Sequence, residues 1–304
     1  MIAIFGSGFG LYGHLPAVVE LGRDVCVPVR YRPAFDERAE LMVYRSAVHF
    51  VEDEAALLSN ADLAVLARRP ADNEALARQA IPRAIQLVIE KPPAPTPQAA
   101  LSLDSALRTA GVRHSTPYLF AYCDWARDCQ RMVTSGDASE ITLNWRFNSP
   151  NSRESWKAMP EDGGGPLSYY FIHVIALAQF FLGDYHVVDC RVTEDGSARK
   201  ISMVAVNGPV RFAGTFCIGS GDSVFSIALN GVSATTAATP FGKVPRRGDR
   251  DPRIDVLKRF YTAEVFSSAT GRGADAGGGR ILAVWAELAE KLRCESDLLP
   301  LSRQ

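Results

Sequence analysis

The sequence predicts an α/β protein with two domains: an N-terminal doubly wound parallel sheet, then an α+β domain with an open, mainly antiparallel sheet. Three observations predict this fold class. Short apolar runs alternate with helical segments over the first third of the chain. A glycine-rich turn directly follows the first apolar run. Beyond about residue 120, β-rich runs follow one another with turn residues between them, which is typical of antiparallel hairpins.

Each short apolar run in the first third is typical of a buried parallel strand that leads to a helix. The expected strands are Ile2–Phe5, Val25–Val29, Leu63–Ala67 and Ile85–Ile89. The expected helices are Leu15–Leu21, Glu52–Leu58, Pro70–Ile81 and Pro97–Ala110. Parallel strands joined by helices place a ligand crevice at the carboxyl ends of the strands. We therefore assign residues 1–118 to a dinucleotide-binding domain.

Residues 119–304 are expected to form a substrate-binding and oligomerisation domain. Helices are predicted over Trp125–Ser135, with Asp124 as the N-cap, and within 163–183. The expected strands are Ile141–Phe147, His186–Val192, Ile201–Val206, Val210–Ile218 and Ser223–Leu229, with hairpin turns at Asn207-Gly208 and Gly219–Asp222. A polar loop over Ser233–Arg253 and helices near Asp255–Ser267 and Arg280–Arg293 complete the chain. The C-terminal helix could pack back on the first domain.

Composition excludes several classes of function. The formal net charge is −1 over 304 residues, which gives no basis for binding nucleic acid or an anionic membrane. No apolar run is long enough to span a bilayer, and the first residues begin a strand at once, so we expect a cytoplasmic protein. The cysteines are scattered, without a CxxC pair or a Cys/His cluster, so neither a metal site nor a disulfide is expected. The expected partner is a small molecule.

A glycine-rich turn stands between the first predicted strand and the first predicted helix. Glycines there let the backbone approach a pyrophosphate, which rests on the helix N-terminus. Counting from Gly6 puts Leu11 in the third glycine position of the dinucleotide fingerprint, whereas counting from Gly8 gives a full match ending at Gly13. The alternative is a flexible turn that binds nothing. The residues expected to hold a dinucleotide are Gly6, Gly8, Phe9, Gly10, Leu11 and Tyr12.

The end of the second predicted strand indicates which dinucleotide is bound. An acidic residue there would favour NAD, whereas arginine would pair with the 2′-phosphate of NADP. This chain has Arg30-Tyr31-Arg32-Pro33 and no acid before Asp36. Two guanidinium groups suit a phosphate, and a tyrosine could stack on adenine. A solvated basic loop is the alternative. We predict NADP, with NAD as the second choice, and expect Arg30 and Arg32 to contact it.

Two further motifs carry residues suited to proton transfer. Glu90-Lys91-Pro92 follows the strand Ile85–Ile89, where a lysine could polarise a carbonyl oxygen beside a nicotinamide. Gly163-Gly164-Gly165 leads into an apolar helix that carries His173. With its ordinary pKa near 6.5, a histidine can move a proton at neutral pH, although a buried core histidine is the alternative.

With these motifs, the sequence resembles the Gfo/Idh/MocA oxidoreductases, a family named for glucose-fructose oxidoreductase, inositol dehydrogenase and a rhizopine-catabolism protein. The shared features follow the family's order across more than half the chain. They are His14-Leu15-Pro16-Ala17 after the glycine turn, Pro70, Glu90-Lys91-Pro92, and the three glycines followed by His173. The resemblance implies a Rossmann domain and hydride transfer between NAD(P) and a carbohydrate-like substrate, with Lys91 as the catalytic residue.

The resemblance also implies cofactor contacts from Arg69, Pro70, Glu90 and Lys91, and a homo-oligomer, a dimer or tetramer, formed through the face of the second sheet. One departure matters. The family's helix has an aspartate four residues before the histidine and another about one turn after it, but here those positions are Tyr169 and Ala176. At that spacing Tyr169 would share a helical face with His173. Its hydroxyl could donate a proton or anchor a substrate, but its ordinary pKa near 10 makes it a poor base.

The reaction predicted from these residues is hydride transfer from C4 of a reduced nicotinamide to a carbonyl or imine carbon. Lys91 would polarise or protonate the acceptor atom, assisted by His173 and Tyr169, while the cofactor carries the hydride. Two alternatives stay open: an imine reductase of a biosynthetic pathway, and a non-catalytic NADP-binding regulator.

Overall fold

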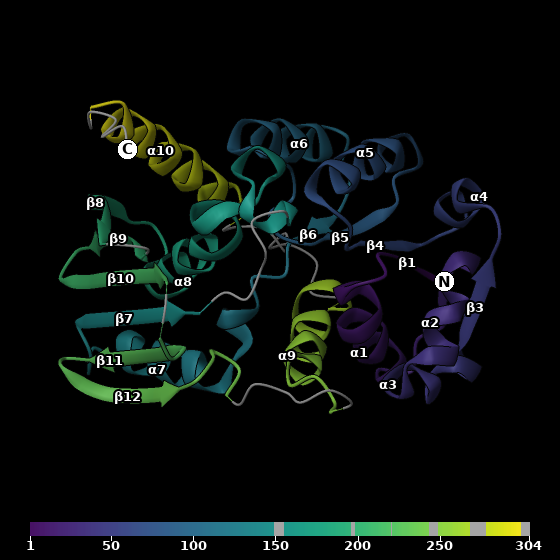
Figure 1. Cartoon of the computed structure of the whole chain (residues 1–304), viewed down its shortest axis with the longest axis horizontal. Helices are drawn as coiled ribbons and strands as arrows, with labels where there is room; N and C mark the ends of the chain where they lie inside the picture. The colour runs from purple at the N-terminus through teal and green to yellow at the C-terminus, as the bar shows by residue number, and fades with distance from the viewer. Residues whose placement is uncertain (149–154, 196–197, 220, 243–248, 268–277, 299–304) are drawn as a thin grey trace. The chain divides into compact units, whose positions relative to one another are not determined.

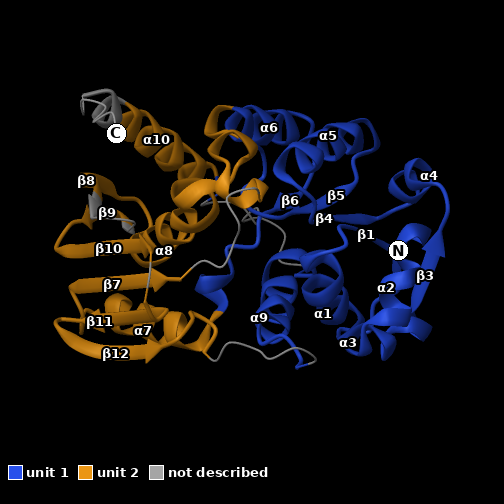
Figure 2. Cartoon of the chain, in the orientation of Figure 1, with its two compact units in different colours: residues 1–95, 99–122, 244–278 blue, residues 96–98, 123–243, 279–304 orange. Residues whose placement is uncertain are grey.

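The computed structural model describes residues 1–148, 155–195, 198–219, 221–242, 249–267 and 278–298. The chain divides into two compact units, coloured blue and orange in Figure 2. The first unit contains residues 1–95, 99–122 and 244–278, and the second contains residues 96–98, 123–243 and 279–304. This division differs from a single boundary after residue 118, because a later segment of the chain returns to the first unit.

The first unit is built on a six-stranded sheet in the order β3-β2-β1-β4-β5-β6, in which all neighbouring strands are parallel. The strands are β1 Ile2–Phe5, β2 Val25–Pro28, β3 Val48–Val51, β4 Leu63–Leu66, β5 Gln86–Ile89 and β6 His114–Ser115. The order reverses between β1 and β4, which is the point where a doubly wound sheet opens a crevice for a ligand. The predicted fold class is confirmed for this domain.

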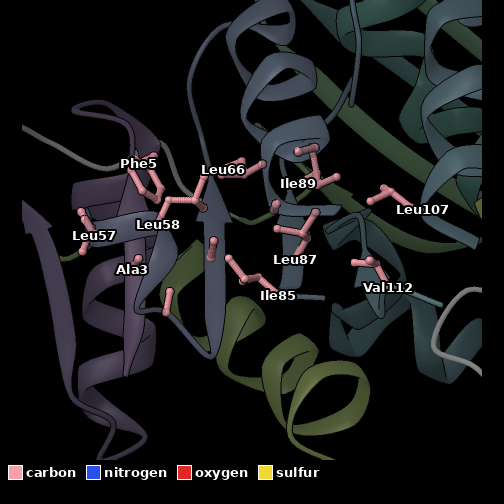
Figure 3. Close-up of a cluster of buried hydrophobic side chains, with 14 of the residues drawn as sticks. Ala3, Phe5, Leu57, Leu58, Leu66, Ile85, Leu87, Ile89, Leu107 and Val112 are labelled. Carbon is pink, nitrogen blue, oxygen red and sulfur yellow. The ribbon is translucent and has the colours of Figure 1, made fainter. Parts of the chain in front are cut away.

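Side chains alternate between the two faces along each strand, and those on one face form a hydrophobic core. Ala3 and Phe5 of β1 belong to this core, together with Leu66 of β4 and with Leu87 and Ile89 of β5 (Figure 3). Helical side chains from α4, α5 and α6 cover this cluster, and Leu107 of α6 belongs to it. Burying such a side chain contributes about 1.5–3 kcal/mol, so the strand ends that carry the site are rigidly supported.

Helices cover both faces of the first sheet, with α5 and α6 on one side and α1 and α9 on the other (Figure 1). Their bounds are α1 Leu15–Glu20, α2 Arg32–Glu37, α3 Ala39–Met42, α4 Glu54–Ser59, α5 Pro70–Ala80, α6 Pro97–Thr109 and α9 Arg253–Phe260. A π-helical turn, Gly10–His14, precedes α1, and another, Tyr261–Val265, follows α9. The described part of the returning segment, 249–267, therefore lies in the first unit. Helix α10, Gly278–Leu298, belongs to the second unit except for Gly278.

Two details of the first unit correct the sequence prediction. Strand β3 was not predicted. It is a short edge strand, Val48–Val51, and because only its first residue is buried, the sequence there shows no apolar run. Helix α4 begins at Glu54 rather than Glu52, because the Asp53 side chain accepts a hydrogen bond from the Ala55 N–H at 2.8 Å and caps the helix there.

The second unit is built on a mixed, mainly antiparallel sheet in the order β12-β11-β7-β10-β9-β8. The strands are β7 Glu140–Phe147, β8 His186–Asp195, β9 Ala198–Asn207, β10 Val210–Ile218, β11 Val224–Leu229 and β12 Val232–Ala237. The predicted hairpin at Asn207-Gly208 is confirmed by the antiparallel pairing of β9 and β10. The predicted hairpin at Gly219–Asp222 is wrong, because β7 lies between β10 and β11 and pairs in parallel with β10.

The helices of the second unit are α7 Asp124–Ser135, α8 Ile172–Leu182 and α10. Asp124 is the first helical residue of α7 and Cys123 occupies the N-cap position, so the predicted cap was one residue late. A π-helical turn, Pro166–Phe171, runs directly into α8. Strand β12 replaces the start of the expected polar loop, and residues 243–248 of that loop lie outside the described residues. No helix in the described part of the chain is long and apolar enough to cross a membrane.

Candidate functional site

The glycine turn after β1 has a shape that only glycine can form. Gly6 has φ of +139°, and a Cβ there would overlap the carbonyl oxygen of Ala67, which follows β4. The Gly6 N–H donates a hydrogen bond to the Tyr31 hydroxyl at 3.0 Å. Tyr31 is buried, so its hydroxyl supports the turn from below the surface. This is a different role from the stacking on adenine that the sequence suggested.

Gly8 is the open position of the turn. A Cβ on Gly8 would meet no heavy atom within 4 Å, whereas its carbonyl accepts the N–H groups of Leu11 at 2.9 Å and Tyr12 at 3.2 Å and opens the helix. A polar backbone with unfilled space above it, at a helix N-terminus, is the surface a pyrophosphate needs. The residues present therefore fit a dinucleotide.

The other glycines of the turn make room for packing. A Cβ on Gly10 would press on Ile4 of β1 at 3.3 Å, and a Cβ on Gly13 would overlap the ring of Phe9. Leu11 is fully buried, so it fills the third fingerprint position counted from Gly6. The geometry favours the alignment that starts at Gly6. In this alignment Gly10, one residue before the third glycine position, lets the helix pack closely on the strand.

Two arginines meet one carboxylate where β2 and β4 end. Arg30 forms an ion pair with Glu54, and Arg68 Nη2 donates to Glu54 Oε2 at 2.5 Å. Arg32 is exposed, with its guanidinium 5.0 Å from the centre of the Phe50 ring. Arg68 was missed by sequence reasoning, although its position beside the predicted Arg69 could have indicated it. Arg69 itself is exposed and precedes α5.

At the end of β5, Glu90 belongs to a buried hydrogen-bonded chain. His14 Nε2 lies 2.8 Å from Glu90 Oε1, and His14 Nδ1 lies 2.7 Å from the Tyr261 hydroxyl. Burial, with Glu90 nearby, raises the pKa of the Tyr261 hydroxyl well above its ordinary value. Sequence reasoning missed this chain, since 247 positions separate His14 from Tyr261. Lys91 follows Glu90 and is partly buried, and its peptide bond to Pro92 is cis.

In the second unit, His173 lies in an aromatic environment. It is 7% exposed, and its ring centre lies 6.2 Å from that of Trp145 on β7. Tyr170 is buried beside the same Trp145, with ring centres 5.9 Å apart. The ring of Tyr169 instead meets Trp156 edge-on at 5.5 Å. Tyr169 and Tyr170 also contact each other, with ring centres 4.9 Å apart, so aromatic contacts connect Trp156 to Trp145 and His173.

The three glycines before this helix are required by geometry. Gly163 and Gly165 have φ of +83° and +78°, and a Cβ on Gly164 would overlap the carbonyl oxygen of Trp156. Ala176, where the family's second aspartate was expected, is buried in the apolar helix. Among the predicted catalytic residues, Lys91 lies in the first unit, and Tyr169 and His173 lie in the second. Across the described ranges, no group of three or more His, Cys, Asp or Glu residues is arranged to hold a metal ion.

A parallel sheet with reversed strand order and a glycine turn shaped for a pyrophosphate define a dinucleotide-binding protein of the Rossmann class. A sequence model described as oxidoreductase family, NAD-binding Rossmann fold, matches residues 1–118. Residues 1–118 therefore match the NAD-binding domain of the Gfo/Idh/MocA oxidoreductases, a family of NAD(P)-dependent oxidoreductases. The resemblance seen in the sequence is thereby confirmed. No curated protein matches the chain.

Solved structures share the fold over nearly the whole chain at low identity. The WlbA (WbpB) dehydrogenase from Thermus thermophilus, in complex with NAD and UDP-GlcNAcA, is 16% identical with a TM-score of 0.66, covering 100% of this chain and 96% of its own. A myo-inositol dehydrogenase from Lactobacillus casei, with NAD(H) and myo-inositol, is 14% identical with a TM-score of 0.70, covering 97% and 94%. A super-repressor mutant of Gal80p from Saccharomyces cerevisiae is 12% identical with a TM-score of 0.70, covering 97% and 96%.

Proposed function

We propose that this chain is an NADP(H)-dependent oxidoreductase that transfers hydride between the nicotinamide and a carbonyl or hydroxyl carbon of a small, sugar-like substrate. The observation that carries the proposal is the open backbone at Gly8, together with Arg30 just after β2 and Lys91 just after β5. Gly6 to Tyr12 would hold the pyrophosphate, and Arg69, Pro70 and Glu90 would complete the cofactor contacts. The bound cofactor supplies the hydride.

The preference for NADP rests on charge at the ribose end of the crevice. Arg30 and Arg68 converge on Glu54, so a dianionic 2′-phosphate could take over the guanidinium groups that this carboxylate now holds. No acidic side chain follows β2 directly to accept a ribose 2′-hydroxyl, since Arg30, Tyr31 and Arg32 occupy those positions.

The chain's own residues would direct the proton and the substrate. Lys91 would hold the substrate oxygen and donate a proton to it as hydride arrives, or withdraw it in the reverse direction. His173 would exchange that proton with solvent, and Tyr169 would anchor the substrate. The ring of Tyr169 lies against Trp156 and 5.5 Å from the Lys157 ammonium, a surface suited to a sugar that carries a negative group.

The first test concerns the pyrophosphate surface. Gly8→Val should leave the free energy of unfolding nearly unchanged, because the space around a Gly8 Cβ is empty, yet it should weaken NADPH binding at least tenfold. Gly6→Ala is the matched variant and should destabilise the fold, because its Cβ would overlap the Ala67 carbonyl. Fluorescence titration and urea unfolding measure the two effects. Unchanged NADPH affinity in Gly8→Val would remove the pyrophosphate assignment.

The second test concerns cofactor choice. Arg30→Asp should weaken NADPH binding about tenfold or more, since a charged hydrogen bond contributes about 1.5–3 kcal/mol, and should leave NADH binding unchanged or improved. Arg83→Asp, a change at an exposed residue before β5, is the control for altered net charge. Equal affinity of the wild type for NADPH and NADH would refute the NADP assignment.

Turnover is tested by following NADPH absorbance with a panel of ketosugars, keto-acids and cyclic imines. Oxidation with ketosugars supports the proposal, and oxidation with cyclic imines alone would instead support an imine reductase. Tight NADPH binding without oxidation of any compound would support a non-catalytic regulator. The presence of Tyr169 and Ala176 at the expected aspartate positions favours that last candidate, and Gal80p, a repressor by its description, has the same fold.

We also propose that the protein is a dimer or tetramer through the face of the second sheet. Along β7, Ile141, Leu143 and Trp145 are buried, whereas the alternate residues Thr142 and Asn144 are not. Other strands alternate in the same way, so one face of the sheet stays accessible among the described residues. Light scattering on the purified protein measures the oligomeric state, and a monomer at micromolar concentration would refute this assignment.

A further inference from the structure

The largely buried hydrogen-bonded series Glu90–His14–Tyr261 joins three distant parts of the first unit. His14 ends the turn before α1, Glu90 follows β5, and Tyr261 starts the π-helical turn after α9. The His14 side chain is 0% exposed and that of Glu90 only 13%. A carboxylate held this far from water by one imidazole depends on that imidazole for its orientation.

Donor and acceptor chemistry sets the direction of the chain. The Glu90 carboxylate can only accept, so His14 Nε2–H donates to it. In a neutral imidazole Nδ1 then carries a lone pair, and the Tyr261 hydroxyl donates to it. The raised pKa of Tyr261 keeps that hydroxyl protonated at neutral pH. In both hydrogen bonds a donor therefore meets an acceptor.

The outer members of the chain are fixed independently. The Tyr261 ring stacks on Phe266 with an interplanar angle of 19° and meets Phe260 edge-on. The Glu90 N–H donates to the Leu66 carbonyl at 2.9 Å, which extends the β4–β5 pairing by one residue. Because backbone and side chain of Glu90 are both held, the next residue, Lys91, leaves the sheet edge from a fixed starting point.

The same segment also supports the glycine turn. The Arg253 guanidinium lies 4.3 Å from the centre of the Phe9 ring, and the His14 ring meets Phe9 edge-on at 5.2 Å. Phe9 in turn covers Gly13. The returning segment 249–267 thus contacts the cofactor turn and, through His14, is linked to the residue before Lys91, although sequence patterns place it in the second domain.

We propose that His14 and Tyr261 are positioning residues: they hold the Glu90 carboxylate, and through it Lys91, in the orientation needed for cofactor binding and proton transfer. The inference rests on the proposed function, in which Glu90 and Lys91 contact the cofactor. Neither His14 nor Tyr261 touches the reacting atoms in this assignment. Their role is to keep the Glu90 carboxylate directed towards His14.

Tyr261→Phe tests the proposal, because it deletes one hydroxyl and keeps a ring that Phe266 already supports. Tyr122→Phe is the matched control. Tyr122 is a partly buried tyrosine whose hydroxyl donates to Glu264 at 2.9 Å and whose ring meets Phe260, so this deletion also removes one hydroxyl that contacts segment 249–267. Both variants should lose similar stability in urea. Only Tyr261→Phe should weaken NADPH binding, by roughly fivefold, which corresponds to one neutral hydrogen bond.

A mutant cycle separates positioning from packing. Glu90→Gln keeps the shape of the side chain and removes its charge. If Tyr261 acts through Glu90, the losses of NADPH affinity in Tyr261→Phe and Glu90→Gln will not add in the double variant, whereas Tyr122→Phe combined with Glu90→Gln will be additive. His14→Gln, whose amide can still donate to Glu90, should retain more affinity than His14→Leu. Additivity of Tyr261→Phe with Glu90→Gln would overturn the proposal.

A second readout needs neither cofactor nor substrate. Acetic anhydride labelling, quantified by mass spectrometry, gives the rate of Lys91 modification relative to Lys258, which is paired with Glu20. In Tyr261→Phe the His14 imidazole loses the hydrogen bond that fixes it, so the Glu90 carboxylate is held less firmly and can turn towards Lys91, and the labelling of Lys91 should slow by roughly threefold. It should not change in Tyr122→Phe. Absence of NADPH binding by the wild type would count against the proposed function alone, whereas equal Lys91 labelling in the wild type and Tyr261→Phe would overturn the positioning role.

Discussion

Two buried histidines, one in each unit, show how differently the same side chain is used. His14 has both ring nitrogens in hydrogen bonds, to Glu90 and to Tyr261. His173 is almost equally buried, and its ring meets the indole of Trp145 edge-on. A histidine whose two ring nitrogens are both held has one arrangement, which suits a structural role. We therefore propose structure and positioning for His14, and proton transfer at neutral pH for His173.

The largest expected effect tests the role of His173. His173→Phe places a ring of similar size among Trp145 and its aromatic neighbours, so the free energy of unfolding should change by less than about 1.5 kcal/mol. Turnover with whichever panel compound the wild type reduces should fall by about 10²–10⁴-fold, which is the range that a general acid or base contributes. Steady-state kinetics and urea unfolding measure the two quantities.

Phe216→Leu is the control for His173→Phe, since Phe216 meets the same Trp145 with ring centres 4.9 Å apart and carries no titratable group. It should lower stability and leave turnover within about threefold, because it changes packing alone. If His173→Phe retained full turnover, His173 would be a core residue and the contrast between the two histidines would disappear.

A smaller effect, on stability, tests the role of His14. His14→Leu leaves the Glu90 carboxylate and the Tyr261 hydroxyl without the partner that now joins them, which should cost about 3–5 kcal/mol of unfolding free energy. The exposed histidine of β3 provides the control: His49→Leu should change stability by no more than about 0.5 kcal/mol. A cost for His14→Leu as small as that of His49→Leu would show that the buried chain contributes nothing to the fold.

The same contrast explains what the sequence could predict. Local patterns were sufficient for β1, for the glycine turn and for the helix that carries His173, because apolar runs and glycines act within a few residues. The prediction failed where distant segments meet. The pairing of β10 with β7 could not be read from the turn at Gly219–Asp222, and β12 is too polar to stand out from a loop.

The candidate site divides in the same way. Arg30 and Lys91 come two residues after the apolar strands β2 and β5, so the sequence alone places them at the carboxyl ends of these strands. The partner of His14 is Tyr261, in a segment that the sequence assigns to the other domain. Tyr169 lies in a π-helical turn before α8, where the four-residue spacing of an α-helix does not apply, and no periodicity in the sequence predicts such a turn.

The smallest expected effect is on stability and concerns a third histidine, His114. It differs from His14 and His173 because its side chain contacts a carboxylate that also binds an arginine. His114 Nε2 lies 2.9 Å from Asp104 Oδ1, and Arg108 contacts the same carboxylate. Burial alone would raise the pKa of Asp104, but hydrogen bonds from His114 and Arg108 outweigh it and lower that pKa to about 2. A carboxyl with a depressed pKa stabilises the fold above its unfolded pKa near 3.9, and this stability is lost as pH falls towards 2.

Asp104→Asn should therefore reduce stability at pH 7 by about 2 kcal/mol and leave less further loss between pH 4 and pH 2 than the wild type shows. Urea unfolding at each pH measures both slopes. Asp128→Asn is the matched control, since Asp128 forms an exposed ion pair with Arg131, which contributes only about 0–1 kcal/mol. NADPH binding should be unchanged in both variants, because neither carboxylate belongs to the cofactor turn. The same pH slope of the unfolding free energy in Asp104→Asn and in the wild type would contradict this prediction. It would mean that the contact between His114 and Asp104 does not contribute to the acid sensitivity of the fold.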